Sequence, residues 1–555
     1  MIFRLHVASL SVVLTCLFVT AQGQNTVGLI QNDPLSAQDG FTLFYPHQQT
    51  STYLIDNCGR VVHEWDDGMH IPGNSVYFME NGDLIRCGRN MGNINPVIDR
   101  GGAGEFVDRR AWDGTLLWRY TYNSPTFRMH HDVEPLPNGN VLIIAWELKT
   151  LAEAAQMGRD TAGAGYSSVW PDHILEVEPT SVDTGDVVWE WHAWDHLVQD
   201  RDPNLPNFGV ISEHPERIDV NYDPGQSEDW MHMNAIHYNE NLDQIILSVP
   251  EFNEIWVIDH STNTLEAAGS TGGNSGKGGD LLYRWGNPEA YGMGTSADQK
   301  LFYQHDVRWL GAGLDPNDQD QGRILVFNNR IGATWSSVDM IEPPVDLQGN
   351  YAFTPGQAYG PDTLVWRYTA PVPDSLFSPG LSSAHRTPNG NFLISSGRQG
   401  WMFEVERNGN LVWEYKIPLQ QGAPVPQGTV LIPGQTNFRG TRIPPDHPFL
   451  TGLPLDPIGY IESDPDTTFC GDINVAVQNV SRKGSVLVHP NPSNGQFTVH
   501  GAVRDRVVVM DQAGRIVLEG QLHSTSERYE LTGMADGAYV LQVGTQRALL
   551  VMNGR

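Results

Sequence analysis

The chain has 555 residues, including 57 Gly, 36 Pro and 16 Trp, and its formal net charge is −31. This length and this supply of turn and aromatic residues argue against a helical or disordered chain and favour a many-stranded β protein with a large core. The negative charge excludes nucleic acid and anionic membrane surfaces as partners, so an anionic substrate must be bound by local groups.

Residues 1–23 are predicted to be an export signal. Arg4 precedes an apolar run over 5–19, and Ala21-Gln22-Gly23 fits the small-x-small site of signal peptidase. A membrane anchor is the alternative, but the run is shorter than the roughly 20 residues of a spanning helix. No later segment is apolar enough to span a bilayer, so the mature chain is expected to have no membrane span.

Six short aromatic motifs recur between residues 24 and 460, and we interpret them as equivalent strands of a repeated unit. They are Val62-His63-Glu64-Trp65, Leu117-Trp118-Arg119-Tyr120, Val188-Trp189-Glu190-Trp191, Leu282-Tyr283-Arg284-Trp285, Val365-Trp366-Arg367-Tyr368 and Val412-Trp413-Glu414-Tyr415. Asn-Gly pairs such as Asn138-Gly139 and Asn389-Gly390 stand before apolar runs, as hairpin turns do. Repeated small sheets of this kind predict a six-bladed β-propeller over residues 24–460.

The Asn-Gly turns also bring chemically similar residues into register. When Asn138 is aligned with Asn81, Asn239 and Asn389, the residue seven positions earlier is Asn74, His131, His232 or Ser382. His305 joins this set because Gln304-His305-Asp306-Val307 repeats the His-Asp-Val of 131–133.

In a propeller the first strand of each blade is innermost, so these residues would ring one mouth of the channel. Packing or hydrogen-bonded channel residues are the alternative for any one histidine. Three histidines at one repeat position, with Asn234 beside His232, favour a polar site.

Three cysteines remain after the signal, Cys58, Cys87 and Cys470, and they are too scattered for a zinc site. Cys58 and Cys87 could form a disulfide in an oxidising compartment, which the sequence leaves open. Residues 315–322 carry oxygen ligands at alternating positions, but they lack the distal glutamate of a calcium loop and are expected to form a surface turn.

The last part of the chain is predicted to be a separate module. Residues 461–484 are interpreted as a linker, and residues 485–555 contain short strands separated by Asn-Gly, Ala-Gly and Asp-Gly turns, which predict a small C-terminal β-sandwich. Its Pro-Asn-Pro-x-x-Gly opening and Gly-x-Tyr ending resemble the type A sorting domain of the type IX secretion system of Bacteroidetes. The resemblance implies that the protein is secreted or placed on the cell surface through the periplasm, with the type IX machinery as a partner.

Residues 27–448 resemble the bacterial arylsulfate sulfotransferase family, whose enzymes move a sulfuryl group between phenols without a nucleotide donor. The segments that carry this resemblance are His130-His131-Asp132-Val133, Asp229-Trp230-Met231-His232-Met233-Asn234, Glu254-Ile255-Trp256-Val257-Ile258-Asp259, Gln304-His305-Asp306 and Arg398-Gln399-Gly400-Trp401-Met402-Phe403-Glu404-Val405. It implies a phenolic sulfate donor, a phenol acceptor and no cofactor or metal. By the same resemblance His305 is the nucleophile, and His131, His232 and Asn234 surround the sulfuryl group.

One departure from the family pattern bears on activity. The family places an arginine just after the strand that follows the His-x-Asn element, whereas this chain has Pro250 there, and Pro supplies neither charge nor donor. Arg308, Arg398 and Arg89 are the candidates to replace it. A propeller that binds a ligand without chemistry, and a metal-dependent hydrolase that uses the same histidines, are therefore the alternative functions.

Overall fold

The computed structural model describes residues 25–92, 95–311, 314, 317–432, 434 and 436–470, and also 487–552 with gaps at 490–492, 494, 501–502, 512–514, 532–533, 536 and 545. The predicted signal peptide and residues 471–484 of the predicted linker lie outside these ranges. The chain divides into two compact units, Met1–Asp466 and Thr467–Arg555. In the described ranges, no helix has the length and apolar character needed to cross a bilayer.

The first unit is built almost entirely from antiparallel strands, which form six sheets of four or five strands in its described residues. Sheet I contains β31 (Asn437–Ile443), β2 (Phe41–Pro46), β3 (Ser51–Asp56), β4 (Arg60–Asp66) and β32 (Gly459–Tyr460). Sheet II contains β5 (His70–Phe78), β6 (Leu84–Asn90), β7 (Phe106–Arg110) and β8 (Leu116–Thr121). Sheet III contains β9 (Phe127–Pro135), β10 (Val141–Glu147), β13 (Asp172–Ser181) and β14 (Thr184–His192).

Sheet IV contains β17 (Ala235–Asn239), β18 (Gln244–Val249), β19 (Glu254–Asp259) and β20 (Tyr283–Trp285). Sheet V contains β21 (His305–Trp309), β22 (Ile324–Asn328), β23 (Ser337–Ile341) and β24 (Trp366–Tyr368). Sheet VI contains β25 (Ser383–Arg386), β26 (Phe392–Ser396), β27 (Trp401–Val405), β28 (Leu411–Lys416) and β1 (Gly28–Asn32).

Short elements decorate this frame. They are the paired strands β11 (Lys149–Thr150) and β12 (Ser168–Val169), β15 (Leu197–Val198) and β16 (Ile218–Asp219), and β29 (Leu419–Gln420) and β30 (Ala423–Pro424), and the helices α1 (Leu151–Gln156) and α2 (Thr264–Ala267). Single 3₁₀ turns are η1 (Glu80–Gly82), η2 (Ala193–His196), η3 (Ile211–Glu213), η4 (Pro288–Tyr291), η5 (Pro373–Ser375), η6 (Gly397–Gln399) and η7 (Pro448–Leu450).

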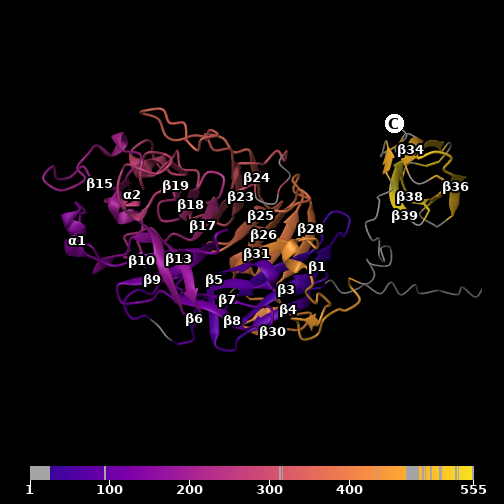
Figure 1. The fold of residues 1–555 in the computed structure, drawn as a ribbon, viewed down its shortest axis with the longest axis horizontal. Helices are drawn as coiled ribbons and strands as arrows, with labels where there is room; N and C mark the ends of the chain where they lie inside the picture. Colours follow the sequence, from indigo (N-terminus) through magenta and orange to yellow (C-terminus); the bar gives the residue numbers. More distant parts are fainter. Residues whose placement is uncertain are drawn as a thin grey trace, which may run out of the picture. The chain divides into compact units, whose positions relative to one another are not determined.

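The six sheets follow one another around the unit in chain order, with β5, β17 and β31 nearer its middle (Figure 1). One edge strand of each sheet faces this middle. These strands contact one another in sequence, from β31 through β5, β9, β17 and β21 to β25, and β25 contacts β31 again. The ends of the chain complete two of the sheets, because β1 pairs with β28 and β31 pairs with β2.

The aromatic motifs lie on or beside β4, β8, β14, β20, β24 and β28, which occupy the same place in the six sheets. In each motif an indole N–H donates to an atom in the connection between the third and fourth strands of the next sheet, or, for Trp118, to the first residue of the fourth strand. The six bonds are Trp65 to Ala111 O (3.2 Å), Trp118 to Thr184 O (2.9 Å), Trp189 to Thr262 Oγ1 (3.1 Å), Trp285 to Pro361 O (2.8 Å), Trp366 to Arg407 O (2.9 Å) and Trp413 to Asn57 O (2.9 Å). The last bond returns from sheet VI to sheet I.

The Asn-Gly turns form as the sequence predicts. Gly139 donates to Leu136 O and Gly390 donates to Thr387 O, each at 3.0 Å, and both glycines have positive φ (91° and 104°). Glycine is the residue that takes this conformation without steric cost, which explains why the pair recurs where the hairpins reverse.

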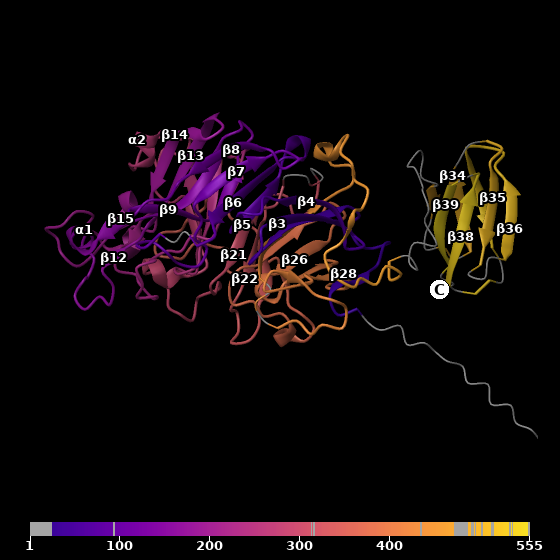
Figure 2. The same cartoon turned by 90° about the horizontal axis from the view of Figure 1, so that it is seen from below.

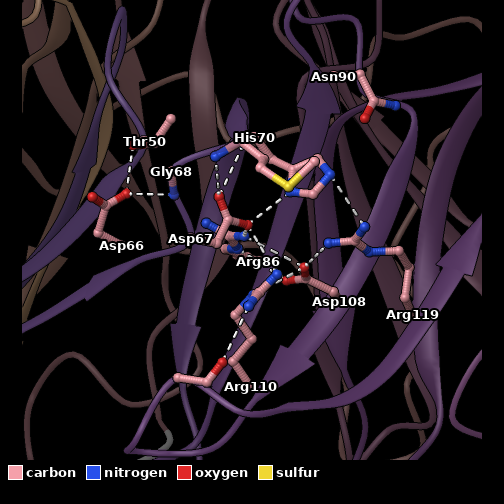
Figure 3. A network of polar contacts seen from close by, with 12 residues as sticks. Thr50, Asp66, Asp67, Gly68, His70, Arg86, Asn90, Asp108, Arg110 and Arg119 are labelled. Carbon is pink, nitrogen blue, oxygen red and sulfur yellow. Dashed lines mark hydrogen bonds and ion pairs between the residues drawn. The ribbon is translucent and has the colours of Figure 1, made fainter.

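Sheet II contains a network of charged side chains (Figure 3). Arg86 is fully buried and binds both Asp67 and Asp108, Arg110 binds the same two carboxylates, and Arg119 binds Asp108. Every charge in the network has a partner, so it is a self-contained structural ion cluster and leaves no free cation for a ligand.

Cys58 and Cys87, whose pairing the sequence leaves open, do not form a disulfide. Cys87 is a free thiol in β6, whereas Cys58 is in a disulfide bond. Cys87 faces a core shared with Val107 and Met129, out of reach of the β3–β4 turn that carries Cys58, and burial raises the pKa of its thiol to about 12.

The second unit consists of two antiparallel sheets (Figure 2). One contains β33 (Leu487–His489), β34 (Gln496–His500) and β37 (Ser526–Glu530), and the other contains β36 (Ile516–Gln521), β35 (Arg506–Met510), β38 (Gly537–Val543) and β39 (Gln546–Met552). Buried side chains of both sheets, such as Phe497, Val507 and Leu541, share one core.

Candidate functional site

The three predicted histidines come from sheets III, IV and V, and they lie on or just before the middle-facing strands of those sheets. His131 lies in β9, His232 lies three residues before β17, and His305 begins β21. The rings of His131 and His232 are 4.5 Å apart between centroids and nearly perpendicular. Burial lowers the pKa of His131 well below its ordinary value, and the neighbouring imidazoles of His232, His130, His305 and His47 lower it further.

The backbone at these positions is unusual. Asn74, His131, His232 and Ser382 all have positive φ (109°, 52°, 56° and 93°). Non-glycine residues in this region cost about 1–3 kcal/mol each and gather at functional sites. The second His-Asp-Val copy differs, because there it is Asp306 that has positive φ (53°) and His305 precedes it.

His131 is bonded through a neighbour that sequence reasoning did not assign. Its Nδ1 lies 2.8 Å from Nδ1 of His130, and Nε2 of His130 lies 2.7 Å from Oδ1 of Asp172. His130 is fully buried and stacks on Trp146, with ring centroids 3.8 Å apart. Among the described residues, Nε2 of His131 has no hydrogen-bond partner. It is therefore the free end of the hydrogen-bonded series that runs from Asp172 through His130 to His131.

His232 is bonded to a carboxylate. Its Nδ1 donates to Oδ2 of Asp229 at 2.5 Å, and Oδ1 of the same carboxylate accepts from Nε1 of Trp146 at 2.8 Å. Burial alone would lower the pKa of His232, but the Asp229 carboxylate outweighs it, so the pKa lies above 6.5. The pKa values of the two neighbouring rings are therefore shifted in opposite directions, upward at His232 and downward at His131.

His305 is held as a single neutral tautomer. The amide nitrogen of Asn329 donates to the carbonyls of Ser378 and Leu381, so its Oδ1 must face His305 and accept from Nδ1–H at 2.9 Å. The remaining lone pair, on Nε2, accepts from the backbone N–H of Leu381 at 3.0 Å. Burial lowers the pKa of His305 to about 3, which keeps the ring uncharged.

Asn234 does not bond to the histidine rings. Its amide nitrogen donates to the carbonyl of Gln304 at 2.8 Å, so it fixes the backbone immediately before His305. Its Oδ1 is buried and has no partner among the described residues.

Pro250 lies in the β18–β19 turn, and two of the three candidate arginines lie near histidines at the middle of the unit. A Cβ built on Gly380 would lie 3.7 Å from Nη2 of Arg398 and 4.0 Å from Cε1 of His305, so guanidinium and imidazole flank one glycine. Burial lowers the pKa of His47 to about 4, and Arg89 and Arg398 both contribute to that shift. Within the described residues neither arginine has a carboxylate partner.

Arg308, the third candidate, is used elsewhere. It binds Asp306 at 2.7 Å, and Arg439 of β31 binds Asp306 at 2.9 Å and Asp132 at 2.6 Å. The aspartates of both His-Asp-Val copies thus meet one arginine. This network ties sheets I, III and V together next to the histidines.

The remaining sequence signals are structural. In the 315–322 segment, residues 315 and 316 lie outside the described residues, and Asp320 is bound by Arg323, Arg386 and Arg407 rather than left open for calcium. Across the described chain no three His, Cys, Asp or Glu side chains are grouped to hold a metal ion.

Several residues of the site were not predicted. Asp229 was visible only as the residue three positions before His232, and His130 only as the first of a His pair. Asp172 and Asn329 gave no signal, because their strands meet the histidines only in the folded chain.

Comparisons with known proteins give two family matches. The model of the arylsulfotransferase (ASST) family matches residues 26–416, and the model of the secretion system C-terminal sorting domain matches residues 487–552. The second match confirms the predicted sorting module and places the protein outside the cell or on its surface. None of the curated proteins matches the chain.

The solved structures that match the chain share little sequence with it. A protein of unknown function from Bacteroides caccae is 13% identical over 68% of this chain and 93% of its own, with a TM-score of 0.36. The β-propeller domain of Cps50 (Swd1) from Myceliophteria thermophila is 10% identical over 72% and 89%, with a TM-score of 0.35. The periplasmic gluconolactonase PpgL of Pseudomonas aeruginosa is 10% identical over 71% and 99%, with a TM-score of 0.32.

Proposed function

The chain belongs to the arylsulfotransferase (ASST) family, and from this membership and the histidine cluster we propose that it transfers a sulfuryl group from a phenolic sulfate ester to a phenol. The observation that carries the proposal is the pairing of two kinds of imidazole in one space. His305 is neutral with its lone pair on Nε2, and we propose that His232, whose pKa the Asp229 carboxylate raises, is charged. A neutral imidazole attacks sulfur, while a charged donor stabilises the anionic group being transferred.

His305 is the proposed nucleophile. Its Nε2 forms a bond to sulfur as the bond from sulfur to the aryl oxygen breaks, and the electron pair of that bond leaves with the phenolate. The N–H of Leu381 must first release Nε2. Leu381 and Ser382 both have positive φ (63° and 93°) and follow Gly380, and the released N–H can then donate to a sulfuryl oxygen.

The other side chains take supporting roles. His131 gives a proton to the departing phenolate, His232 and Arg398 hold the sulfuryl oxygens, and Asn234 positions the backbone at His305. Arg398, with Arg89 behind it, substitutes in this proposal for the arginine that the family has where this chain has Pro250. A fixed guanidinium is well suited to an anion, because its charge is permanent.

We propose six blades for the first unit. The support is the ring of indole bonds, in which Trp413 joins sheet VI to sheet I as Trp118 joins sheet II to sheet III. The second unit is proposed to be a β-sandwich spanning 485–555, preceded by a linker over 461–484.

A second candidate is a propeller that binds aryl sulfates without chemistry. It is favoured by one observation, namely that the Nε2 lone pair of His305 already accepts a hydrogen bond from Leu381. The two candidates differ in whether a covalent intermediate forms.

The test is a single-turnover experiment without acceptor. Wild type at high concentration, mixed with an aryl sulfate, should release a burst of phenol equal to the enzyme and leave an acid-labile sulfuryl adduct on His305. His305→Asn should abolish both. Binding of the aryl sulfate with no burst would favour the non-catalytic candidate, and an adduct mapped to His131 would reject His305 as the nucleophile.

A further inference from the structure

Three buried side chains form a continuous hydrogen-bonded chain that ends in the site. Asp172, the first residue of β13, binds His130, and His130 binds His131 through facing Nδ1 atoms. Asp172 and His130 are fully buried and His131 is 2% exposed. Only the far end of the chain, Nε2 of His131, is left without a partner in the described residues.

Two nitrogens that face each other at 2.8 Å share one proton, so this chain has two self-consistent arrangements. In one, Asp172 is ionised, His130 donates from Nε2, His131 donates from Nδ1, and Nε2 of His131 carries a lone pair. In the other, Asp172 is protonated and donates to His130, which donates from Nδ1 to His131, and Nε2 of His131 carries a proton. The two differ by one proton, and neither contains a charged imidazole.

We propose that Asp172, His130 and His131 form a proton relay that lets a neutral His131 deliver a proton to the leaving phenolate and recover one from the incoming phenol. This inference rests on the proposed function. In the first half-reaction the phenolate oxygen takes the proton from Nε2 of His131, Nδ1 of His131 takes one from Nδ1 of His130, and Nε2 of His130 takes the proton of Asp172. The carboxyl becomes a carboxylate, and the second half-reaction reverses each transfer.

The surroundings favour storage of the proton on the carboxyl. Burial raises the pKa of Asp172 well above its ordinary range and the Asp229 carboxylate raises it further, although the Met233 N–H and the charge of His232 oppose them and Glu147 adds to them. Burial lowers the pKa of His130 well below its ordinary value; Asp229 opposes this shift, and His232 and Arg128 add to it. An imidazolium is therefore disfavoured at 130 and 131, while a neutral carboxyl is tolerated at 172.

Asp172→Asn is a directed test, because the structure dictates how the carboxamide must lie. Oδ2 of Asp172 accepts from the backbone N–H of Met233 at 2.8 Å, so the amide oxygen faces Met233 and the NH₂ group faces Nε2 of His130. His130 is then fixed with its proton on Nδ1, and His131 is fixed with its proton on Nε2. The relay can no longer move a proton.

The expected kinetic signature is a dependence on the leaving group. Phenyl sulfate leaves as a phenolate whose conjugate acid has a pKa of about 10 and needs the proton, whereas a nitro-substituted phenolate does not. Asp172→Asn should slow the burst with phenyl sulfate by about 10²–10⁴-fold and the burst with nitrophenyl sulfate by less than about 10-fold. His173→Phe removes a buried histidine that is next to Asp172 but is not part of the relay. This variant should leave the ratio of the phenyl sulfate rate to the nitrophenyl sulfate rate unchanged.

A second readout needs no activity. In ¹⁵N NMR of histidine-labelled wild type, His131, assigned with His131→Gln, should change from the Nε2–H to the Nδ1–H tautomer as pH rises, and should stay Nε2–H in Asp172→Asn. His130→Phe, which keeps an aromatic ring on Trp146, should abolish this coupling. Equal loss on both substrates, or a tautomer that does not respond to pH in wild type, would overturn the relay. A tautomer switch in a protein that shows no burst would instead reject the transferase and leave the relay standing.

Discussion

The charge on His232 should set the upper pH limit of the reaction, and Asp229→Asn tests this. Oδ1 of Asp229 accepts from Nε1 of Trp146 at 2.8 Å, so the new amide keeps its oxygen toward Trp146 and turns its NH₂ toward Nδ1 of His232. His232 then remains a donor at Nε2 but is neutral. The substitution therefore removes the charge and retains the hydrogen bond.

The size of the effect follows from the contact between the two groups. An opposite charge at this range shifts a pKa by about 1–3 units, so the pKa of His232 should fall by that amount in the variant. Removal of one donor to a developing oxyanion costs about 10²–10³-fold, which sets the upper bound on the loss. We expect a loss of about 10- to 10³-fold at pH 8, and a smaller loss at pH 5.5, where His232 can still be protonated.

The assay is the pH dependence of the phenol burst. In wild type the rate should fall as pH rises through the raised pKa of His232, and in Asp229→Asn this limb should move to lower pH. The same shift has a consequence for stability: the contribution of the His232–Asp229 pair is fully present below the unfolded pKa of 6.5 and is lost as pH rises through the folded one. The variant should therefore lose more stability at pH 6 than at pH 9.

Asp243→Asn is the matched control. Asp243 accepts from Nδ1 of His260 at 2.8 Å. Burial lowers the pKa of His260, but its hydrogen bonds to Asp243 and Glu176 outweigh burial and raise that pKa to about 9. This pair is bonded to no residue of the site, so its loss should leave the burst unchanged. If Asp229→Asn left the pH limb in place and the rate within about 2-fold at pH 8, the charge on His232 would have no part in transfer.

Three further predictions concern other parts of the molecule. Arg398→Gln should raise the KM for the aryl sulfate by about 10–100-fold, the value of one charged hydrogen bond, and Arg60→Gln, at an exposed arginine paired with Asp56, should not change it. Trp413→Phe and Trp118→Phe should each lower the free energy of unfolding by about 1–3 kcal/mol in urea titrations, because each leaves one backbone carbonyl unbonded; a negligible loss for Trp413 alone would show that its junction is not part of a continuous ring. Deletion of 485–555 should leave the first unit folded but retained in the periplasm, and normal export of the truncated chain would reject the sorting role of the tail.

Much of the frame could be predicted from the sequence because its determinants are local. Each Asn-Gly pair fixes a hairpin by the positive φ of its own glycine, and each aromatic motif alternates along one outer strand. The indole that marks such a motif also makes the bond to the next sheet, so a single residue such as Trp285 signals both the strand and its neighbour. One such motif is weak evidence for a strand, but its six recurrences indicate a fold built from repeated sheets.

The site was predicted less completely because its bonds join segments far apart in the chain. The register that placed His131, His232 and His305 together follows from repeats, but the position of the bulge in each strand does not. At His131 the left-handed residue is the histidine itself, whereas at 305–306 it is Asp306. The two rings consequently have different partners, Asp172 through His130 in one case and Asn329 in the other, which no spacing could reveal.

The cation that the family has at the position of Pro250 can be replaced only by a cation near the histidines that has no carboxylate partner, and the net charge of the whole chain does not decide this. In a chain of net charge −31, arginines such as Arg308 and Arg439 are neutralised by Asp306 and Asp132 and offer nothing to an anion. The groups that we propose for the sulfuryl oxygens are instead His232, whose pKa is raised, and the guanidiniums of Arg398 and Arg89. A relay that keeps His130 and His131 neutral fits this arrangement, because a proton then moves through the site without adding a positive charge that would hold the phenolate in place. The site can thus bind the sulfuryl group through His232 and Arg398, while the neutral relay of Asp172, His130 and His131 lets the aryl group leave.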